Sequence, residues 1–341
     1  MKIKSILKLG TLALLTAALP ACSFLDTDPQ IIPDDGYYNS EQKLIYGLAG
    51  VYGVLNSEAL YGNYYSLQIA NADDLCYFNN YNNSESRPDR YNHSAGTAAI
   101  YDTWSKLYEG IKNATRYIEA VQKTEIDPGK LSVDIGLYIA EARFLRAYYH
   151  FLLVVRFHNI PLILSVPEDG NRESVQTPQS STRDVYLQII KDMEEAAPLV
   201  RTAAELQSPG RVSQSTVYGM LARVALYMAG YPVKEPGMYA KAKEYAQKVI
   251  DTGSHAMNAS YEQVFINYIQ DKYDAGESLF EVEFWGTNEG TYTTTAGMVG
   301  RNNGIGCSST NIIGDTGKSV VDLFGYSIGA IRTTPYFFTL F

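Results

Sequence analysis

The chain has 341 residues, of which 46% are hydrophobic and 19% are charged, and its formal net charge is −9. This composition fits a folded protein of one large or two modest domains and excludes a disordered chain. The acidic balance argues against a nucleic-acid-binding protein, because such proteins carry basic patches. Tyrosine occurs 28 times, and we expect most of these rings to pack between helices.

Residues 1–21 have the organisation of a signal peptide. Three lysines precede a short apolar run that ends in LPAC, with Ala21 directly before Cys22. This ending resembles the lipobox of bacterial lipoproteins, in which the cysteine thiol receives diacylglycerol and the new amino terminus is acylated, for example with palmitate. We therefore expect Cys22 to be a lipid anchor that holds the protein on a membrane without spanning it. The alternative is an ordinary secretory signal.

Residues 22–38 are rich in Pro and Asp, which indicates an extended tether. Beyond it, apolar residues recur at steps of three and four, the pattern of amphipathic helices. One such stretch, EARFLRAYYHFLLVVRFHNIPLIL at residues 141–164, contains three arginines and no uncharged run of the roughly 20 residues that a membrane helix needs. It predicts a packed helix that ends near Pro161. The expected helices span approximately residues 40–55, 98–123, 132–158, 183–200, 214–229 and 238–251.

The helices at 214–229 and 238–251 predict a close antiparallel pair, because small residues recur along both. As in tetratricopeptide arrays, we expect one contact face on each helix, formed by Tyr218, Leu221, Ala222 and Ala225 on the first and by Ala240, Ala242, Ala246 and Ile250 on the second. The predicted fold class is mostly α, an irregular tetratricopeptide-like helix-pair array with a loop-rich C-terminal part. Residues 39–265 would form the helical N-terminal domain and residues 266–341 the start of a C-terminal region, in which ESLFEVEFW alternates like a strand.

The chain lacks a credible catalytic or metal-binding motif. GYSIG at residues 325–329 matches a nucleophile elbow, but the last histidine is His255, so the usual order of the triad cannot be completed. The histidines lack metal-ligand spacing, so we predict no enzyme activity, no metal and no cofactor. Cys76 and Cys307 are expected either to be two free thiols or to form one disulfide.

An aromatic and amide-rich loop is the best candidate for a binding site. Residues 76–97 contain five asparagines and three tyrosines, and a loop of this length is commonly functional. Flat rings stack on sugar faces, and planar amide or guanidinium groups bridge sugar hydroxyls. A solvated loop whose asparagines only make turns is the alternative. The candidate ligand-binding residues are Tyr77, Phe78, Asn80, Tyr81, Asn83, Arg87 and Tyr91, with Trp285 and Tyr292 from the second loop-rich region.

Several stretches together resemble the SusD/RagB family of outer-membrane nutrient-binding lipoproteins of Bacteroidetes-type bacteria. The resemblance is carried by the lipobox, FLDTDP after the cysteine, YDTWSKLYEGIKNATRYIE, EARFLRAYYHFLLVVRFHNIPLIL, VYGMLARVALYMAG, YAKAKEYAQKVIDTG and ESLFEVEF, in this order. It implies a fold of tetratricopeptide-like helix pairs and no catalytic activity.

The resemblance also implies partners and a location. We expect a lipid-anchored protein on the outer membrane, facing the cell exterior, that binds an oligo- or polysaccharide beside a SusC-like, TonB-dependent transporter. The alternatives are a scaffold that contacts only the transporter and a family member that binds peptides. Family members are usually longer, so we expect this chain, which ends in RTTPYFFTLF, to hold an incomplete C-terminal region.

Overall fold

The computed structural model describes residues 37–69, 76–78, 88–167, 176–270, 272–284, 306–307, 309–324 and 326–340. The expected signal peptide, Cys22 and almost all of the expected tether lie outside these ranges. The main helices are α3 (Glu41–Tyr52), α4 (Ala98–Lys123), α5 (Ile135–Phe157), α6 (Thr182–Ala196), α8 (Gln214–Ala229), α9 (Met238–Asp251) and α10 (Tyr261–Ile269). The short elements are η1 (Glu58–Gly62), η2 (Tyr64–Ile69), η3 (Pro88–Arg90), η4 (Pro128–Lys130), α7 (Ala203–Leu206), η5 (Gly314–Thr316), α12 (Val320–Phe324), α13 (Pro335–Phe338), and the strands β1 (Cys76–Phe78), β2 (Ile160–Pro161), β3 (Gln179–Ser180) and β4 (Ile331–Thr333).

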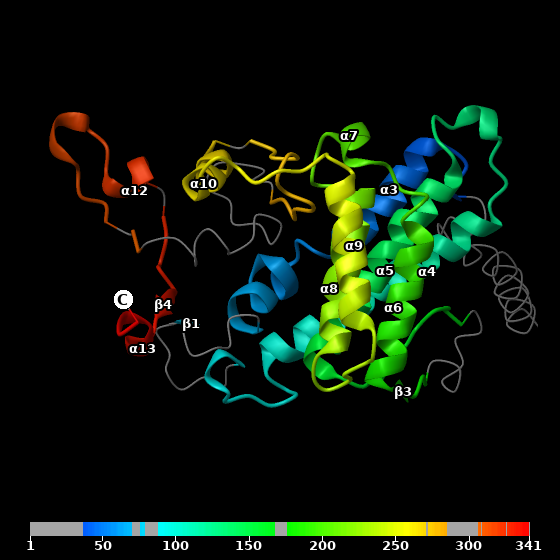
Figure 1. Cartoon of the computed structure of the whole chain (residues 1–341). Coiled ribbons are helices and arrows are strands. Elements are labelled where there is room, and N and C mark those ends of the chain that lie inside the picture. The colour runs from blue at the N-terminus through cyan, green and yellow to red at the C-terminus, as the bar shows by residue number, and fades with distance from the viewer. Residues whose placement is uncertain are drawn as a thin grey trace, which may run out of the picture.

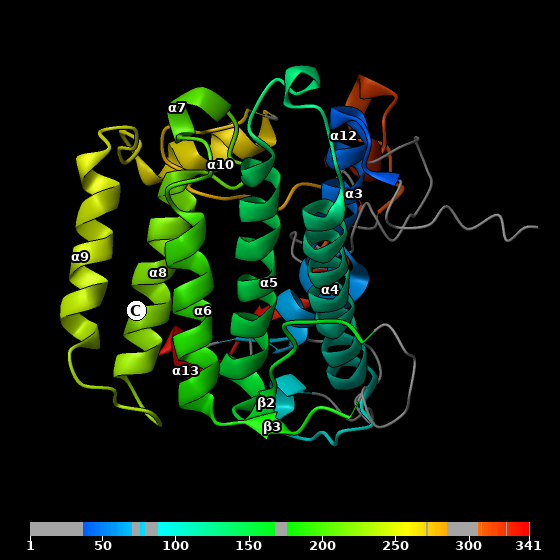
Figure 2. The ribbon, with the colours of Figure 1, turned by 90° about the vertical axis from the view of Figure 1, so that its right-hand side faces the viewer.

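The molecule is mostly helical, and its long helices form one layer. Helices α4, α5, α6, α8 and α9 lie side by side in chain order, as Figure 2 shows, and each packs against the next. Helix α3 packs across α4 and α5. Consecutive helices are neighbours in space, and this arrangement confirms the predicted tetratricopeptide-like array.

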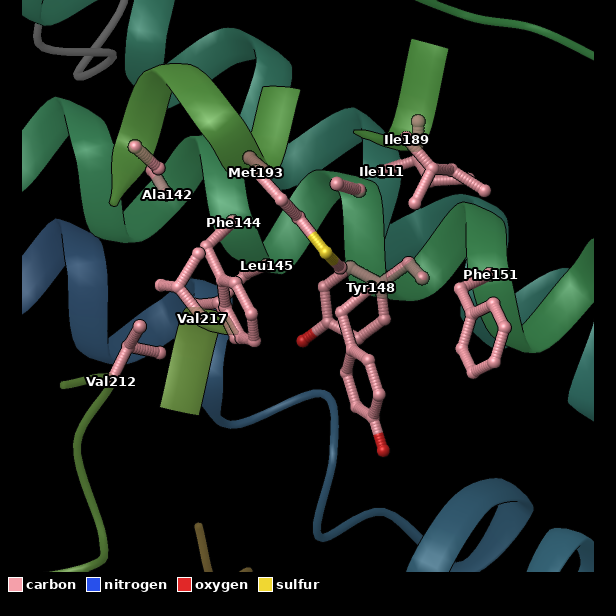
Figure 3. Packing of buried hydrophobic residues seen from close by; sticks show 14 of the residues in the cluster. Ile111, Ala142, Phe144, Leu145, Tyr148, Phe151, Ile189, Met193, Val212 and Val217 are labelled. Carbon is pink, nitrogen blue, oxygen red and sulfur yellow. The ribbon is translucent and has the colours of Figure 1, made fainter. Parts of the chain in front are cut away.

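Helix α5 is the centre of the core, because neighbouring elements cover most of its circumference. Phe144, Leu145 and Leu153 are fully buried, and Phe151 is 4% exposed. Figure 3 shows this packing, in which side chains of α5 meet Met193 and Ile189 of α6 and Val217 of α8. The continuous burial explains why the sequence of α5 looks hydrophobic enough for a membrane, although no helix among the described residues is long and apolar enough to cross one.

Buried tyrosines connect neighbouring helices, because the ring packs in the core and the hydroxyl donates to a backbone carbonyl. The Tyr149 hydroxyl donates to the carbonyl of Val51 at 2.6 Å, and the Tyr117 hydroxyl donates to the carbonyl of Leu44 at 2.9 Å. Gly110 lets α4 approach α5, because a Cβ atom there would lie 2.8 Å from the Tyr149 ring. Buried rings with satisfied hydroxyls stabilise the layer. Many of the tyrosines are therefore packing residues, as expected.

Several helix boundaries match the prediction because the sequence carries clear caps. The Ser181 side chain accepts from the amide of Asp184 at the start of α6, and the Ser213 side chain accepts from Thr216 at the start of α8. Helix α5 begins after Asp134, whose side chain accepts from the amide of Gly136. At Ser40 the backbone begins α3 without a side-chain capping bond.

The predicted contact face of α9 is wrong. Helices α8 and α9 do pack together, but Ala246 and Ile250 are exposed, Ile250 by 69%. The buried residues of α9 are Ala242 and Tyr245. The larger Tyr245 side chain buries more apolar area than the alanine stripe, and this turns α9 about its axis.

The C-terminal part is loop-rich, as predicted, but residues 276–284 do not form a strand. In this segment the amide of Glu281 donates to the carbonyl of Pro209 at 2.9 Å, and the carbonyl of Leu279 accepts from the Thr216 hydroxyl. The alternating side chains instead let Phe280 pack between Phe144 and Tyr148. Phe280 and Val282 pack against the helical core and Glu283 is exposed, so the segment is an extended strip on the helices and not a strand of a sheet.

Candidate functional site: an aromatic face beside a strand pair

The start of the predicted binding loop pairs with the C-terminal part of the chain. Strands β1 and β4 are antiparallel, with Tyr77 opposite Arg332 and Phe78 opposite Ile331. Element η3 packs against β1, and Tyr91 follows η3 directly. In Figure 1 the pair lies away from the helical layer, with α13 beside it. The sequence analysis selected candidates in the loop that begins at β1 but none at residues 331–333, with which the start of this loop pairs.

Tyr91, directly after η3, is exposed and has a strained backbone conformation. Its backbone has φ = 54°, and its side chain is 72% exposed. A positive φ is uncommon for a bulky residue and costs on the order of 1–3 kcal/mol. The amide of Tyr91 donates to Pro88 at 3.0 Å, which holds the turn. Strain that keeps a ring in solvent is typical of a recognition residue.

The C-terminal segment adds polar and aromatic groups that the sequence analysis did not select. Arg332 in β4 and Tyr336 in α13 are exposed, Tyr336 by 56%. We call Tyr91, Arg332 and Tyr336 the aromatic face. The terminal RTTPYFFTLF contains these residue types, but nothing in its spacing indicates that β4 pairs with a loop more than 250 residues earlier in the chain.

The other predicted ligand residues are only partly described. For Tyr77 and Phe78 the structure describes the strand backbone. Asn80, Tyr81, Asn83, Arg87, Trp285 and Tyr292 lie outside the described residues. Their assignment to the binding site therefore remains a prediction.

A hollow of about 370 Å³ lies between α3 and the extended segment 280–283, a volume in the range of small-ligand sites. Its apolar wall includes Leu48, Leu55 and Phe280, and its polar groups include Arg211 and Glu283. The sequence analysis missed it, because it joins helix α3 to a segment that looked like an ordinary strand.

A buried carboxylate lies beneath this hollow. Glu141 accepts from the Tyr52 hydroxyl at 2.5 Å and from Arg211 at 2.5 and 3.2 Å. The Tyr52 oxygen accepts in turn from the amide of Val212 at 3.0 Å. Burial, followed by the charge of Glu141, raises the pKa of Tyr52 well above its ordinary value, so Tyr52 stays a donor. Each oxygen of Glu141 is satisfied, which makes this network a structural joint between α3, α5 and the loop before α8.

The polar residues of α5 are also structural. Arg146 forms a buried ion pair with Asp192 of α6 at 2.7 Å. His150 lies within 2.9 Å of the Arg146 carbonyl through Nδ1, and its Nε2 accepts from the amide of Ile163 at 3.4 Å. Burial lowers the pKa of His150 to about 3, so the ring is neutral near pH 7. These groups join α5 to α6 and to the following loop.

The described residues offer no arrangement for catalysis by a metal or by a serine triad. Among residues 37–340 as far as the structure describes them, no three His, Cys, Asp or Glu side chains could hold a metal ion. Ser327 of GYSIG is 7% exposed, and its backbone pairs with Cys307. Cys307 is a free thiol.

A family model described as "Starch-binding associating with outer membrane" matches residues 23–226, more than half of the chain. The chain belongs to the SusD-like family. This confirms the resemblance to SusD/RagB proteins, a family of carbohydrate-binding proteins associated with the outer membrane.

Known relatives agree with the family and with the fold. SusD-like protein P25 of Formosa agariphila is 23% identical over 257 residues, covering 71% of this chain and 45% of that protein. A SusD homologue from Bacteroides thetaiotaomicron has a TM-score of 0.72 at 26% identity, covering 88% of this chain and 55% of the other. Surface glycan-binding protein A from Bacteroides fluxus shares the fold, with a TM-score of 0.65 at 20% identity over 89% of this chain and 62% of its own. The chain spans about half the length of the first two relatives.

Proposed function

We propose that this chain is a cell-surface lipoprotein that binds a glycan and passes it to a SusC-like, TonB-dependent outer-membrane transporter without chemically changing it. The observation that carries the proposal is the antiparallel pairing of β1 with β4. It sets two aromatic regions beside each other in a member of a carbohydrate-binding family. A related protein is described as a laminarin-binding SusD-like protein, which supports a polysaccharide ligand.

The aromatic face offers the chemistry that sugars require. Exposed rings such as Tyr91 and Tyr336 present flat apolar surfaces to sugar C–H groups. The guanidinium of exposed Arg332 can bridge neighbouring hydroxyls. The predicted loop residues Asn80, Tyr81, Asn83 and Arg87 would add amides and a second guanidinium to the same face.

A panel of soluble polysaccharides tests the ligand. The purified chain is run in native gels that contain starch, laminarin, xylan or polygalacturonate, and slowed migration reports binding. We expect at least one polysaccharide to retard the protein and Tyr336→Ala to weaken that retardation. Tyr239→Ala is the matched control, because Tyr239 is 66% exposed on α9, in the helical layer. If no polymer slows the protein and it co-purifies with the transporter, the chain is a scaffold and not a glycan-binding protein. If it retains only peptides, it is a peptide-binding member of the family.

The proposed anchor at Cys22 has a separate test. The thiol is the group in LPAC that can form a lipid thioether, so Cys22→Ser should move the protein from the membrane fraction to the soluble fraction. Phase separation in detergent measures this shift, with Cys307→Ser as control because Cys307 lies far along the chain as a free thiol. Continued partition of the Cys22→Ser protein into the detergent phase would show that the lipobox interpretation is wrong.

A further inference from the structure

A cluster of tyrosines lies at the junction between the helical layer and the loop region. Tyr61 and Tyr65 come from η1 and η2, Tyr148 from α5 and Tyr227 from α8. The hydroxyls of Tyr61 and Tyr148 share a hydrogen bond, and the rings of Tyr61 and Tyr65 meet edge to face at 5.8 Å. We call these four residues the tyrosine cluster. Three of them are largely buried, whereas Tyr227 is 44% exposed.

Two exposed arginines border this cluster. The guanidinium of Arg156, in the last turn of α5, lies 5.9 Å from the centre of the Tyr65 ring. Arg223 lies on α8 one turn before Tyr227. Burial raises the pKa of Tyr65, and the charges of Arg156 and Arg223 both oppose that rise. Burial likewise raises the pKa of Tyr148 to about 12 against the opposing charge of Arg223. Both guanidinium groups therefore act on the buried hydroxyl of Tyr65, and Arg223 also acts on that of Tyr148.

Neither arginine is neutralised by a carboxylate within the described part of the chain. Arg143, Arg146, Arg183 and Arg211 each form an ion pair with an Asp or Glu. Arg156 and Arg223 form none with any residue that the structure describes. In a chain whose net charge is −9, two such arginines beside an apolar, aromatic surface form a local positive site.

The tyrosine cluster lies next to the elements of the aromatic face. Element η2 packs against η3, and η3 packs against β1, which pairs with β4. In Figure 1 the blue ribbon of η1 and η2 lies between the helical layer and the strand pair. The tyrosine cluster and the strand pair are therefore connected by a continuous series of packed elements.

We infer that Arg156 and Arg223, with the exposed ring of Tyr227, form a subsite for the carboxylate or sulfate group of an acidic glycan. This inference rests on the proposed function. A guanidinium group donates two parallel hydrogen bonds to a carboxylate or sulfate, and its planar fork suits both anions. The Tyr227 ring, held edge to face against Phe151 at 5.4 Å, offers a fixed stacking surface for the sugar that carries the anion. The subsite selects charged sugar units, whereas the aromatic face accepts neutral ones.

The test compares acidic and neutral polysaccharides on matched variants of the full chain. Calorimetry measures binding of polygalacturonate, of dextran sulfate and of laminarin at low and at high salt. We expect the wild type to bind polygalacturonate or dextran sulfate, more weakly at high salt, and the polymer that binds more tightly identifies the anion. Arg156→Gln and Arg223→Gln should each weaken that binding at least tenfold and leave laminarin binding unchanged. Arg116→Gln, which removes an exposed arginine on α4, should change neither.

Each outcome decides the inference. Equal binding of the acidic polymers by the wild type and by the Arg156→Gln/Arg223→Gln double variant overturns it. Binding of laminarin but of neither acidic polymer also overturns the acidic subsite and leaves the proposed glycan-binding function intact. Binding of no polymer contradicts both the subsite and the proposed function. If a glutamine variant unfolds, Arg223→Lys replaces it. Lysine keeps the charge and loses the paired geometry, so a partial loss confined to the acidic polymer supports the subsite, and an unchanged affinity contradicts it.

Discussion

The helical layer and the C-terminal segment that pairs with β1 are held together in different ways. All of the largest fully buried side chains lie between Leu44 and Tyr245 and belong to one continuous cluster. In residues 306–340, as far as the structure describes them, Ala330 is the buried hydrophobic residue. That segment is held by backbone pairing, with β1 and between Cys307 and Ser327.

This difference separates the part of the molecule that stabilises the fold from the part whose side chains are available to a ligand. Burial of apolar area stabilises the layer by roughly 25 cal/mol per Å², so its side chains are constrained by packing. The C-terminal segment buries little, and its rings and arginine stay at the surface, where they are available to a ligand. Regions with few buried contacts open at low free energy. We expect substitutions in the layer to affect folding and substitutions in the segment to affect binding.

The largest effect is expected from the buried ion pair between α5 and α6. Arg146→Met leaves Asp192 buried without its partner, although Gln188 still donates to the other carboxylate oxygen. Loss of one member of a buried pair costs about 3–5 kcal/mol, which denaturant unfolding measures. Arg183→Met is the control, because it breaks the exposed pair with Glu235 and should change the unfolding midpoint little. Equal shifts of the unfolding midpoint in the two variants would mean that water reaches Asp192 and solvates its charge.

A core ring gives the direct contrast between the two regions. Phe151→Ala removes a side chain that is 4% exposed and should lower the free energy of unfolding by about 3–5 kcal/mol. Leu323→Ala in α12 removes a side chain that is 41% exposed, and we expect a change below about 0.5 kcal/mol. Should Leu323→Ala destabilise as strongly as Phe151→Ala, the C-terminal segment would belong to the cooperative core.

Much of the layer could be predicted from the sequence because its signals are local. The stripe of apolar residues defines α4, α6, α8 and α9 within a few residues, and serine caps mark the starts of α6 and α8. The orientation of α9 was wrong because the sequence does not show that Tyr245 is buried in place of Ile250.

The candidate sites were harder to predict, because they join segments that are far apart in the chain. The strand pair links residues 76–78 to residues 331–333. The tyrosine cluster and its arginines bring together residues from positions 61 to 227. Helical and strand periodicity reports local structure, so it cannot show which distant segments meet. Residue types alone, in loop 77–93 and at Trp285 and Tyr292, indicated a binding region.

A smaller effect is expected from pH, through His150. Its pKa falls from 6.5 in the unfolded chain to about 3 in the fold, so protonation favours the unfolded state. The stabilising contribution of the neutral ring is complete above pH 6.5 and is lost progressively as the pH falls toward 3. Between pH 6.5 and pH 5 this amounts to about 2 kcal/mol.

The measurement compares unfolding free energies at the two pH values in the wild type and in His150→Gln. Glutamine carries a donor and an acceptor but does not titrate. Between pH 6.5 and pH 5 the variant should therefore lose about 2 kcal/mol less unfolding free energy than the wild type. The comparison uses the change with pH, which is independent of any constant cost of the substitution. Parallel curves for the two proteins would show that His150 takes up its proton while the helical layer stays folded.

The smallest effect on stability, and a clear effect on binding, is expected at Tyr91. Its ring is 72% exposed, so Tyr91→Ala removes little packing and should leave the melting temperature unchanged. Stacking of a base on an aromatic ring contributes ~1–3 kcal/mol, and a sugar face should lie at the low end of that range. We therefore expect a several-fold weaker affinity for the polysaccharide that the wild type retains, with similar losses for Tyr81→Ala and Trp285→Ala. Tyr91→Gly separates strain from stacking, because glycine adopts φ = 54° without steric cost. Unchanged affinity in the alanine variants would move the ligand away from loop 77–93, and a large drop in melting temperature would place their rings in the core.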